Sequence, residues 1–373
     1  MKEFELYILD EDFVQLCLVD TFESMIWTDR YDEAGDFELY LSTSSNALVY
    51  AKHGNYLWTK GSDRLMIIEQ TEITTDVENG NHLKITGRSL ESILDRRIIW
   101  HQVTVSGKVQ TVVKKLITDQ IISPALAARR IDNFIFVDSD DAYINSCEIE
   151  EVQYLGDNLY DVVVDILSVF QIGFKITHND VTGNFEFRLY NGTDRSYNQD
   201  ILPWVVFSPE FDNIISSDYI ESSVPYKNVN LVAGEEPDKD SGRLRKFVYV
   251  DDSTTVSGLS RREMYTDGSS KQQDYTDEND VEVHLSDSEY ISVLKQLGLE
   301  ELNKKENRLS QDFDGEMNTT RGFVYGVDFE LGDIVQMENE YGLGAPTRVS
   351  EFIMSQDVNG VKMYPTFESI GSE

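Results

Sequence analysis

The stretch Ser24–Ser42, SMIWTDRYDEAGDFELYLS, contains two apolar runs separated by a turn that is dense in charge. Its second half alternates strictly, because Phe37, Leu39 and Leu41 share one side and other residue types occupy the opposite side. Such a period of two is typical of a β-strand with one buried face. Gly35 permits the bend that precedes this strand. The stretch therefore predicts a β-hairpin whose second strand enters a core.

The charged turn of this hairpin has two interpretations. Carboxylates around an arginine form an acid/base site in some enzymes, but catalytic carboxylates also need a cleft. The chain holds 68 acidic residues among 373, so neighbouring carboxylates arise by chance. We therefore interpret Asp29, Arg30 and Asp36 as ion pairs that set the shape of the hairpin or meet a neighbouring subunit. Trp27, at the end of the first run, is a further candidate contact with a subunit or partner.

The overall charge is strongly negative. Lysine and arginine number 32 against 68 acids, which gives a formal net charge of −36. A general basic patch for nucleic acid is therefore not expected. An acidic surface keeps a chain soluble until a specific partner binds, and it can also line a passage through which DNA moves without sticking.

Few residue types suited to metals or nucleophilic catalysis are present. The two cysteines, Cys17 and Cys147, are far apart, which excludes a disulfide framework and a cysteine-based zinc site. Asp138 and Asp140 begin a stretch like a calcium loop, but Ala142 and Tyr143 stand where an oxygen ligand and a glycine are needed. The sequence has no Gly-x-Ser-x-Gly elbow and no lysine-containing phosphate loop. We expect no enzyme activity, no metal and no cofactor.

Hydrophobic patterning divides the chain into three parts. Residues 1–100 contain several short alternating strands, which favour a small barrel or sandwich, followed by a short helix over RSLESILDRR. Residues 101–205 contain two helical patterns and a hairpin around Thr182–Gly183, as expected for an α+β insertion. Residues 206–373 are a second β region with a helical insertion around 286–308, which starts with a capping box from Ser286 to Glu289.

The two β regions share a local feature and further turn signals. Gly35–Asp36 leads into FELYLS, and Gly332–Asp333 leads into IVQM, so Asp333 joins the candidate contact residues. Asn79–Gly80 and Asn359–Gly360 each separate two alternating runs and predict tight hairpins. The first residues are acidic and alternating, unlike a signal peptide, and no apolar run approaches the roughly 20 residues of a membrane span.

Several segments resemble one known family when they are taken in order. Residues 26–42, the strand RLMIIEQ and the following ITGRSLESILDRRII resemble siphovirus tail hub proteins, the tail-associated family of long non-contractile phages. RREMYTD, VYGVDFELGDIVQM and RVSEFIMSQDVNGVKMYPTFE resemble the same family near the C-terminal end. The resemblance covers essentially the whole chain.

This resemblance implies a fold similar to the baseplate hub of contractile phage tails. The expected class is α+β and mainly β, with two small antiparallel β-barrels and an inserted α+β domain. Three chains would form a ring at the distal end of the tail tube. Two barrels per chain would give six similar units, so a threefold hub could mate with a sixfold tube.

The resemblance also implies partners and a location. The homotrimer would contact the distal tail protein ring and the tape-measure protein, and a tail fibre or receptor-binding protein is a further candidate. DNA would pass through its channel without specific binding. The location would be the tail tip of the virion, after assembly in the bacterial cytoplasm. The chain ends shortly after the last expected strand, so no further hydrolase or receptor-binding module is expected.

Two alternatives remain open at this point. A carbohydrate- or receptor-binding tail protein predicts aromatic side chains exposed together in a shallow groove. A cell-wall hydrolase predicts a deep cleft with two carboxyl groups of raised pKa.

Overall fold

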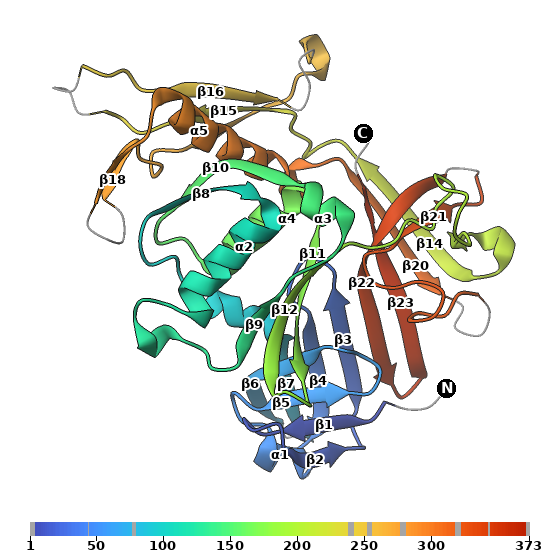
Figure 1. The fold of residues 1–373 in the computed structure, drawn as a ribbon. Coiled ribbons are helices and arrows are strands. Elements are labelled where there is room, and N and C mark those ends of the chain that lie inside the picture. Colours follow the sequence, from blue (N-terminus) through green and yellow to red (C-terminus); the bar gives the residue numbers. More distant parts are fainter. Residues whose placement is uncertain are drawn as a thin grey trace.

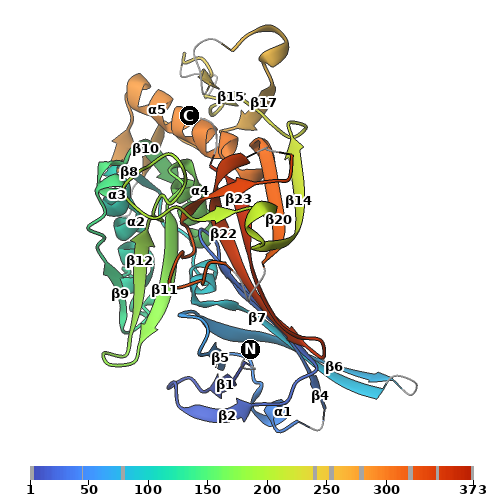
Figure 2. The same ribbon diagram turned by 90° about the vertical axis from the view of Figure 1, so that its right-hand side faces the viewer.

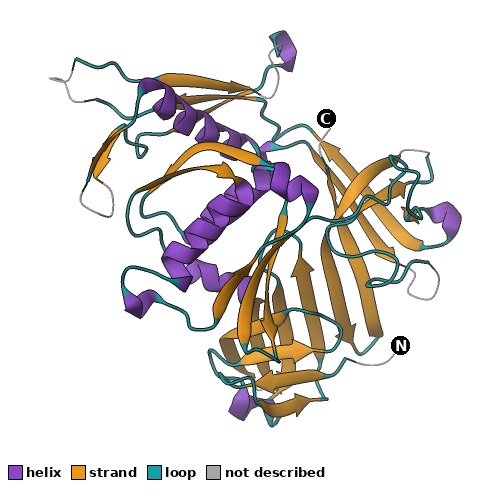
Figure 3. Cartoon of the chain, viewed as in Figure 1, coloured by secondary structure: helices purple, strands orange, loops and turns teal. Residues whose placement is uncertain are grey.

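The computed structural model describes residues 4–43, 45–76, 80–237, 242–251, 256–276, 281–317, 322–341 and 344–370. Strands hold 42% of the residues and helices 21%, which confirms a mainly β protein with some helices. Figure 3 shows that the longer helices lie close to one another and beside the large sheet.

The described part of the N-terminal β region contains seven strands and two short helical segments. These elements are β1 (Leu6–Leu9), β2 (Gln15–Val19), β3 (Ser24–Arg30), β4 (Asp36–Ser42), α1 (Ala47–Tyr50), β5 (Tyr56–Thr59), β6 (Leu65–Asp76), β7 (Gly80–Ser89) and the 3₁₀ helix η1 (Leu90–Arg96). The expected short helix is thus η1, with Leu90, Ile93 and Leu94 buried. The turn expected at Asn79–Gly80 falls on residues 77–79, outside the described residues, although β6 and β7 do pair antiparallel.

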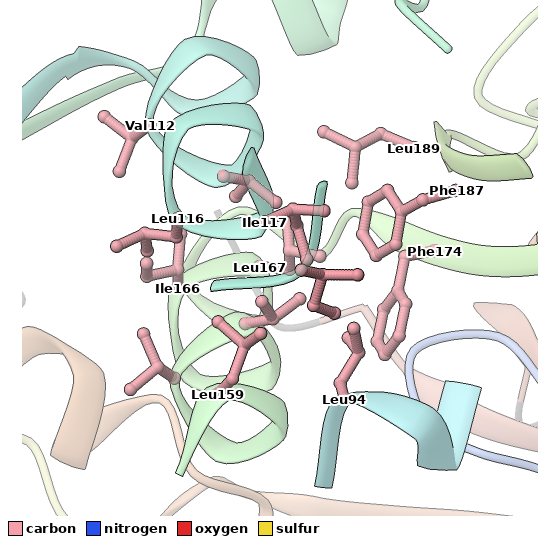
Figure 4. Packing of buried hydrophobic residues seen from close by; sticks show 14 of the residues in the cluster. Leu94, Val112, Leu116, Ile117, Leu159, Ile166, Leu167, Phe174, Phe187 and Leu189 are labelled. Carbon is pink, nitrogen blue, oxygen red and sulfur yellow. The ribbon is translucent and has the colours of Figure 1, made fainter. Parts of the chain in front are cut away.

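The middle region is an α+β unit. Its elements are β8 (Val103–Lys108), α2 (Val109–Ile117), the π-helix η2 (Thr118–Ile122), η3 (Ala127–Arg129), β9 (Phe134–Val137), α3 (Ala142–Ser146), β10 (Glu148–Tyr154), α4 (Leu159–Val169), β11 (Gly173–Asn179) and β12 (Asn184–Tyr190). The aliphatic stripes of α2 and α4 pack against phenylalanines of β11 and β12 (Figure 4). The acidic stretch that resembles a calcium loop caps a helix, because Asp141 accepts a hydrogen bond from the Ile144 amide at the start of α3.

The C-terminal region contains the remaining strands and one long helix. Its elements are β13 (Val206–Phe207), η4 (Pro209–Phe211), β14 (Ile214–Ser222), β15 (Val229–Ala233), β16 (Phe247–Asp251), η5 (Gly258–Ser260), β17 (Glu263–Asp267), β18 (Asp274–Thr276), β19 (Glu282–His284), α5 (Asp287–Leu302), η6 (Lys305–Asn307), β20 (Ser310–Met317), β21 (Ile334–Glu338), β22 (Gly344–Asp357) and β23 (Gly360–Ser369). The predicted capping box of Ser286 and Glu289 is present at the start of α5. The hairpin expected at Asn359–Gly360 joins β22 to β23.

The two β regions join in one sheet. The strand order is β14-β20-β23-β22-β3-β4-β7-β6-β5-β1-β2, with β21 attached to β22 and β13 attached to β21, which makes 13 described strands. The connection is the antiparallel pair β3–β22, in which Glu351 lies opposite Arg30 and Gln356 opposite Met25. Figures 1 and 2 both show β3 and β22 side by side.

This sheet differs from the expectation of two small closed barrels. Among the described strands, no closed barrel is found, and the path stays open at β2 and β14. Alternation specifies which face of a strand is buried, but it does not specify which distant strand lies beside it. The β3–β22 pairing, which the barrel prediction did not include, therefore needed the structure.

The described residues form three apolar cores in this arrangement. The first unites both β regions, since Trp27 and Phe37 share it with Val349 and Phe352. The second fills the middle region and also takes in η1. The third lies between α5 and the sheet of β15, β16 and β17, at the top of Figure 1. The domain limits at residues 100 and 205 stay predictions.

Candidate functional site

The hairpin of β3 and β4 forms as predicted. Thr28 pairs with Asp36 at its closed end, and Phe37, Leu39 and Leu41 are buried on one face. The bend needs Gly35, because a Cβ there would overlap the carbonyl oxygen of Thr28. The charged turn therefore connects two strands of the central sheet.

Arg30 at the end of β3 binds two carboxylates. Its guanidinium lies 2.6 Å from Asp36 Oδ2, within the hairpin, and 2.6 Å from Glu351 Oε1, on β22. It also donates to the Ala34 carbonyl at 2.9 Å. The arginine is thus an ion-pair centre that connects the hairpin to the C-terminal β region. The side chains of Arg30 and Asp36 stay 23% and 43% exposed, so both retain surface for a further contact.

Trp27 and Asp29 lie inside the first core. Trp27 is completely buried, and its indole Nε1 donates to Asp29 Oδ1 at 2.9 Å. Ser62 Oγ donates to the other oxygen of Asp29 at 2.7 Å. Burial raises the pKa of Asp29, and the charge of Arg64 with these hydrogen bonds opposes that increase. In this chain alone, neither side chain presents a surface to a partner.

Asp333 organises a separate connection. Its two carboxylate oxygens accept hydrogen bonds from the Thr193 amide at 2.7 Å and from Arg195 Nε at 2.9 Å. Its side chain is only 5% exposed. The residue fixes the segment after β12 against the start of β21, and its own side chain does not bind the hairpin.

The turn contains a buried residue that the sequence reasoning missed. Tyr31 is 2% exposed, and its ring lies between Gly173 and Gly332, where a Cβ at either position would overlap the ring. The Arg348 guanidinium lies 4.9 Å from the ring centroid, a cation–π distance. The hydroxyl donates to the Gln171 carbonyl at 3.1 Å. One side chain of the charged turn thus contacts the other two regions.

The backbone of Tyr31 makes the same connections. Its amide donates to the Ser350 carbonyl at 2.9 Å, and its carbonyl accepts from the Phe174 amide at 3.2 Å. The sequence did contain a sign of this role, because Tyr31 is an aromatic residue within a run of charged residues. Its partners, however, are more than a hundred residues away in sequence. Gly332, from the second Gly–Asp pair, is also brought to the hairpin through this ring.

A buried ion pair lies beside this junction. Arg64, 3% exposed, binds Glu91 of η1, which is fully buried. The same carboxylate oxygen of Glu91 accepts the Ile176 amide at 2.8 Å, and Arg64 also donates to the Arg30 carbonyl at 3.1 Å. A buried pair of this kind strongly penalises the loss of one partner. It therefore fixes the middle region on the N-terminal β region.

The chemistry of this junction is structural. A pocket of about 480 Å³ adjoins it, but the charges lining the pocket include Arg64 and Lys175, which already bind Glu91 and Asp63. Within the part of the chain that the structure describes, no group of three or more His, Cys, Asp or Glu side chains is placed to hold a metal ion. The site joins three regions of one chain through paired charges and one tyrosine.

Comparison with known families agrees with this architecture. The family model for "Siphovirus ReqiPepy6 Gp37-like protein" matches residues 5–367. The chain belongs to this family. The match confirms the resemblance to siphovirus proteins that the sequence segments suggested. No curated protein matches this chain.

Solved structures with the same fold include three tail proteins. The tail protein from Neisseria meningitidis MC58 has 11% identity and a TM-score of 0.54, over 99% of this chain and 98% of that one. The prophage MuSo2 43 kDa tail protein from Shewanella oneidensis has 10% identity and a TM-score of 0.55, over 98% of both chains. Prophage tail protein gp18 from Listeria monocytogenes EGD-e has 9% identity and a TM-score of 0.52, over 99% and 95%. This chain thus has a phage tail protein fold.

None of the described helices of the chain is long and apolar enough to cross a membrane.

Proposed function

We propose that this protein is the hub of a phage tail tip. Three copies form a ring that closes the distal end of the tail tube and adapts its threefold symmetry to the sixfold tube. The ring opens on host contact and lets the tape-measure protein and DNA pass.

The observation that carries this proposal is the arrangement of the central sheet. Among the described strands, β14-β20-β23-β22 with the attached β21 and β13 form the part of the sheet on the β22 side of the β3–β22 contact, and β3-β4-β7-β6-β5-β1-β2 form the part on the β3 side. Each chain thus offers two β units of similar size, and three chains offer six. The sheet stays open at β14 and β2, and open edges carry backbone groups with which a neighbouring chain can pair.

The proposed partners are the distal tail protein ring, the tape-measure protein and a tail fibre or receptor-binding protein. Arg30 and Asp36, which remain partly exposed, are the proposed direct contacts. Trp27, Asp29 and Asp333 remain candidate contacts, although all three are buried within the single chain. The net charge of −36 supports passage of DNA through the ring without specific binding. The protein would be a virion component that assembles in the bacterial cytoplasm.

We propose no catalytic role. Burial raises the pKa of Asp165 to about 6 and that of Glu300 to about 7. Carboxyl groups with raised pKa values are one feature that a hydrolase needs. However, these groups belong to the packed helices α4 and α5. Neither lines the pockets of about 770, 480 and 260 Å³ among the described residues. Raised pKa values of groups that pack between helices and lie outside these three pockets favour a structural role.

Cryo-electron microscopy of purified tail tips tests the hub proposal. We expect three copies around the tail axis at the distal end of the tube. Density for this chain on peripheral fibres, away from the axis, would refute it. Native mass spectrometry of the protein with the distal tail protein adds a measure of stoichiometry.

A further inference from the structure

A second pocket, of about 770 Å³, has Arg64 of the buried ion pair in its lining and lies between the N-terminal β region and the β11–β12 hairpin. Its walls come from β1, the loop between β1 and β2, β5 and the lower end of that hairpin as seen in Figure 1. The volume is in the range of pockets that bind ligands or side chains of a partner. We call it the β1–β5 groove.

Aromatic rings form much of the groove. Tyr7 and Trp58 contact each other with ring centroids 5.4 Å apart. The ring of Phe13 is stacked between His178 at 3.5 Å and Tyr56 at 4.8 Å. These rings come from two regions of the chain and give the groove broad apolar faces with polar edges.

The loop that carries Phe13 has a strained conformation. Phe13 has φ 60, in the left-handed region, which is rare for a bulky residue. Asp10 holds the loop, because its carboxylate accepts the amides of Asp12 at 3.0 Å and Val14 at 2.9 Å. Strain of this kind persists only where the surroundings impose it, and it is concentrated at functional sites.

The charge of the groove is negative after internal pairs are counted. Asp63 binds Lys175, and Asp180 lies 3.1 Å from His178. Arg64 at the base binds Glu91. Glu11 and Asp12, both exposed on the loop, have no ion-pair partner among the described residues. Besides Asp180, whose partner is a histidine, the groove thus offers the carboxylates of Glu11 and Asp12 beside aromatic faces.

One buried atom in the groove wall also lacks a partner. The His178 side chain is 9% exposed, and its Nε2 makes no hydrogen bond with any described residue. Its Nδ1 faces the Asp180 carboxylate, which suits a proton on Nδ1 and leaves Nε2 as an acceptor. Buried polar atoms normally have a partner, so this wall is suited to a ligand that brings N–H groups.

We propose that the β1–β5 groove binds an arginine- or lysine-bearing segment of a partner protein. The cationic group would lie over Trp58 or Tyr56 and between Glu11 and Asp12, which combines cation–π and ionic attraction. A neutral sugar would use the aromatic faces and donate hydroxyl hydrogen bonds to the two carboxylates, but it would lack the charge–charge attraction that a cationic side chain gains from them. The inference does not depend on the hub proposal, since the groove belongs to a single chain.

Fluorescence anisotropy of a labelled Gly-spaced triarginine peptide, at 0.15 M salt, tests this groove with the full chain. The double variant E11Q/D12N should weaken binding about tenfold, because two charge-assisted contacts are lost. The control D200N/E210Q removes the same charge at exposed acids outside the groove and should change affinity less than about twofold. Equal weakening by both double variants, or no binding to the wild-type chain, would overturn the proposal.

A second measurement separates the peptide from a sugar. W58L should weaken peptide binding about tenfold, provided that circular dichroism shows an intact fold. E11Q and D12N change exposed residues and remain informative if W58L does not fold. Titration with a neutral N-acetylglucosamine trimer should show no competition with the peptide. Displacement of the peptide by the trimer, unaffected by E11Q/D12N, would assign the groove to carbohydrate instead.

Discussion

Replacing Glu300 by glutamine should make the protein more stable at alkaline pH. Glu300 lies on α5, is 5% exposed, and accepts a hydrogen bond from the Tyr154 hydroxyl of β10 at 3.0 Å. Burial raises its pKa from 4.5 to about 7, although the charge of Lys271 opposes this increase. The folded chain therefore favours the protonated carboxyl group, and glutamine imitates that form.

The sign and size of the effect follow from linkage. Between pH 4.5 and about 7 the folded state binds more protons than the unfolded state, so stability falls as pH rises through this window. The difference between 4.5 and about 7, at about 1.4 kcal/mol per pH unit, corresponds to about 3 kcal/mol. E300Q should thus match the wild-type chain near pH 4.5 and exceed its free energy of unfolding by about 3 kcal/mol at pH 8.5.

Urea unfolding at pH 4.5 and 8.5 measures this difference, with far-ultraviolet circular dichroism as the signal. E301Q is the matched control, because Glu301 lies on the same helix, is 26% exposed and binds Lys304, just beyond the end of the helix, at 2.8 Å. Its effect should be below about 1 kcal/mol and similar at both pH values. An E300Q chain that is equally or less stable than wild type at pH 8.5 would refute the reasoning.

Three further changes test the junction. G332A should destabilise the chain by at least about 3 kcal/mol in urea unfolding, since φ is +94 and the new methyl would overlap the buried tyrosine ring; G326A, with φ +78 but open space, should lose only about 1–2 kcal/mol. R64M should lose about 3–5 kcal/mol by leaving Glu91 buried and unpaired, and R64M/E91Q should recover part of that loss; additive losses would contradict a coupled pair. R30E places a third carboxylate between its two acidic partners, so tails should fail to assemble; normal assembly and infection by phage carrying R30E would exclude an interface role.

Features with a local cause could be predicted from the sequence. The alternation of Phe37, Leu39 and Leu41 identified the strand and its buried face, because a strand exposes successive side chains to opposite sides. Ser286 and Glu289 identified the start of α5, because their side chains and amides satisfy one another within one turn. The ion pair of Arg30 with Asp36 also lies within the hairpin and was anticipated.

Features that join distant segments could not be predicted in this way. Tyr31 lies among charged residues, and only the packing of Gly173 and Gly332 shows why a ring stands there. Trp27 and Asp29 were expected as contact candidates, but they hydrogen-bond to each other within the core. The partner of β3 across the sheet is more than 300 residues away in sequence, and hydrophobic patterning contains no information on such a pairing.

The position of the charges suggests how a ring of these chains would move. The β3–β22 pair is reinforced by Arg30 and Glu351, and the nearby Arg64–Glu91 pair is buried. A shift in the register of β3 against β22 would separate Arg30 from Glu351, and a shift of the middle region would leave Glu91 unpaired, so each chain resists sliding between its own halves. The path of described strands ends at β2 and β14, where a neighbouring chain can pair with the sheet. We therefore infer that each chain moves as one unit and that opening of the proposed ring takes place between chains.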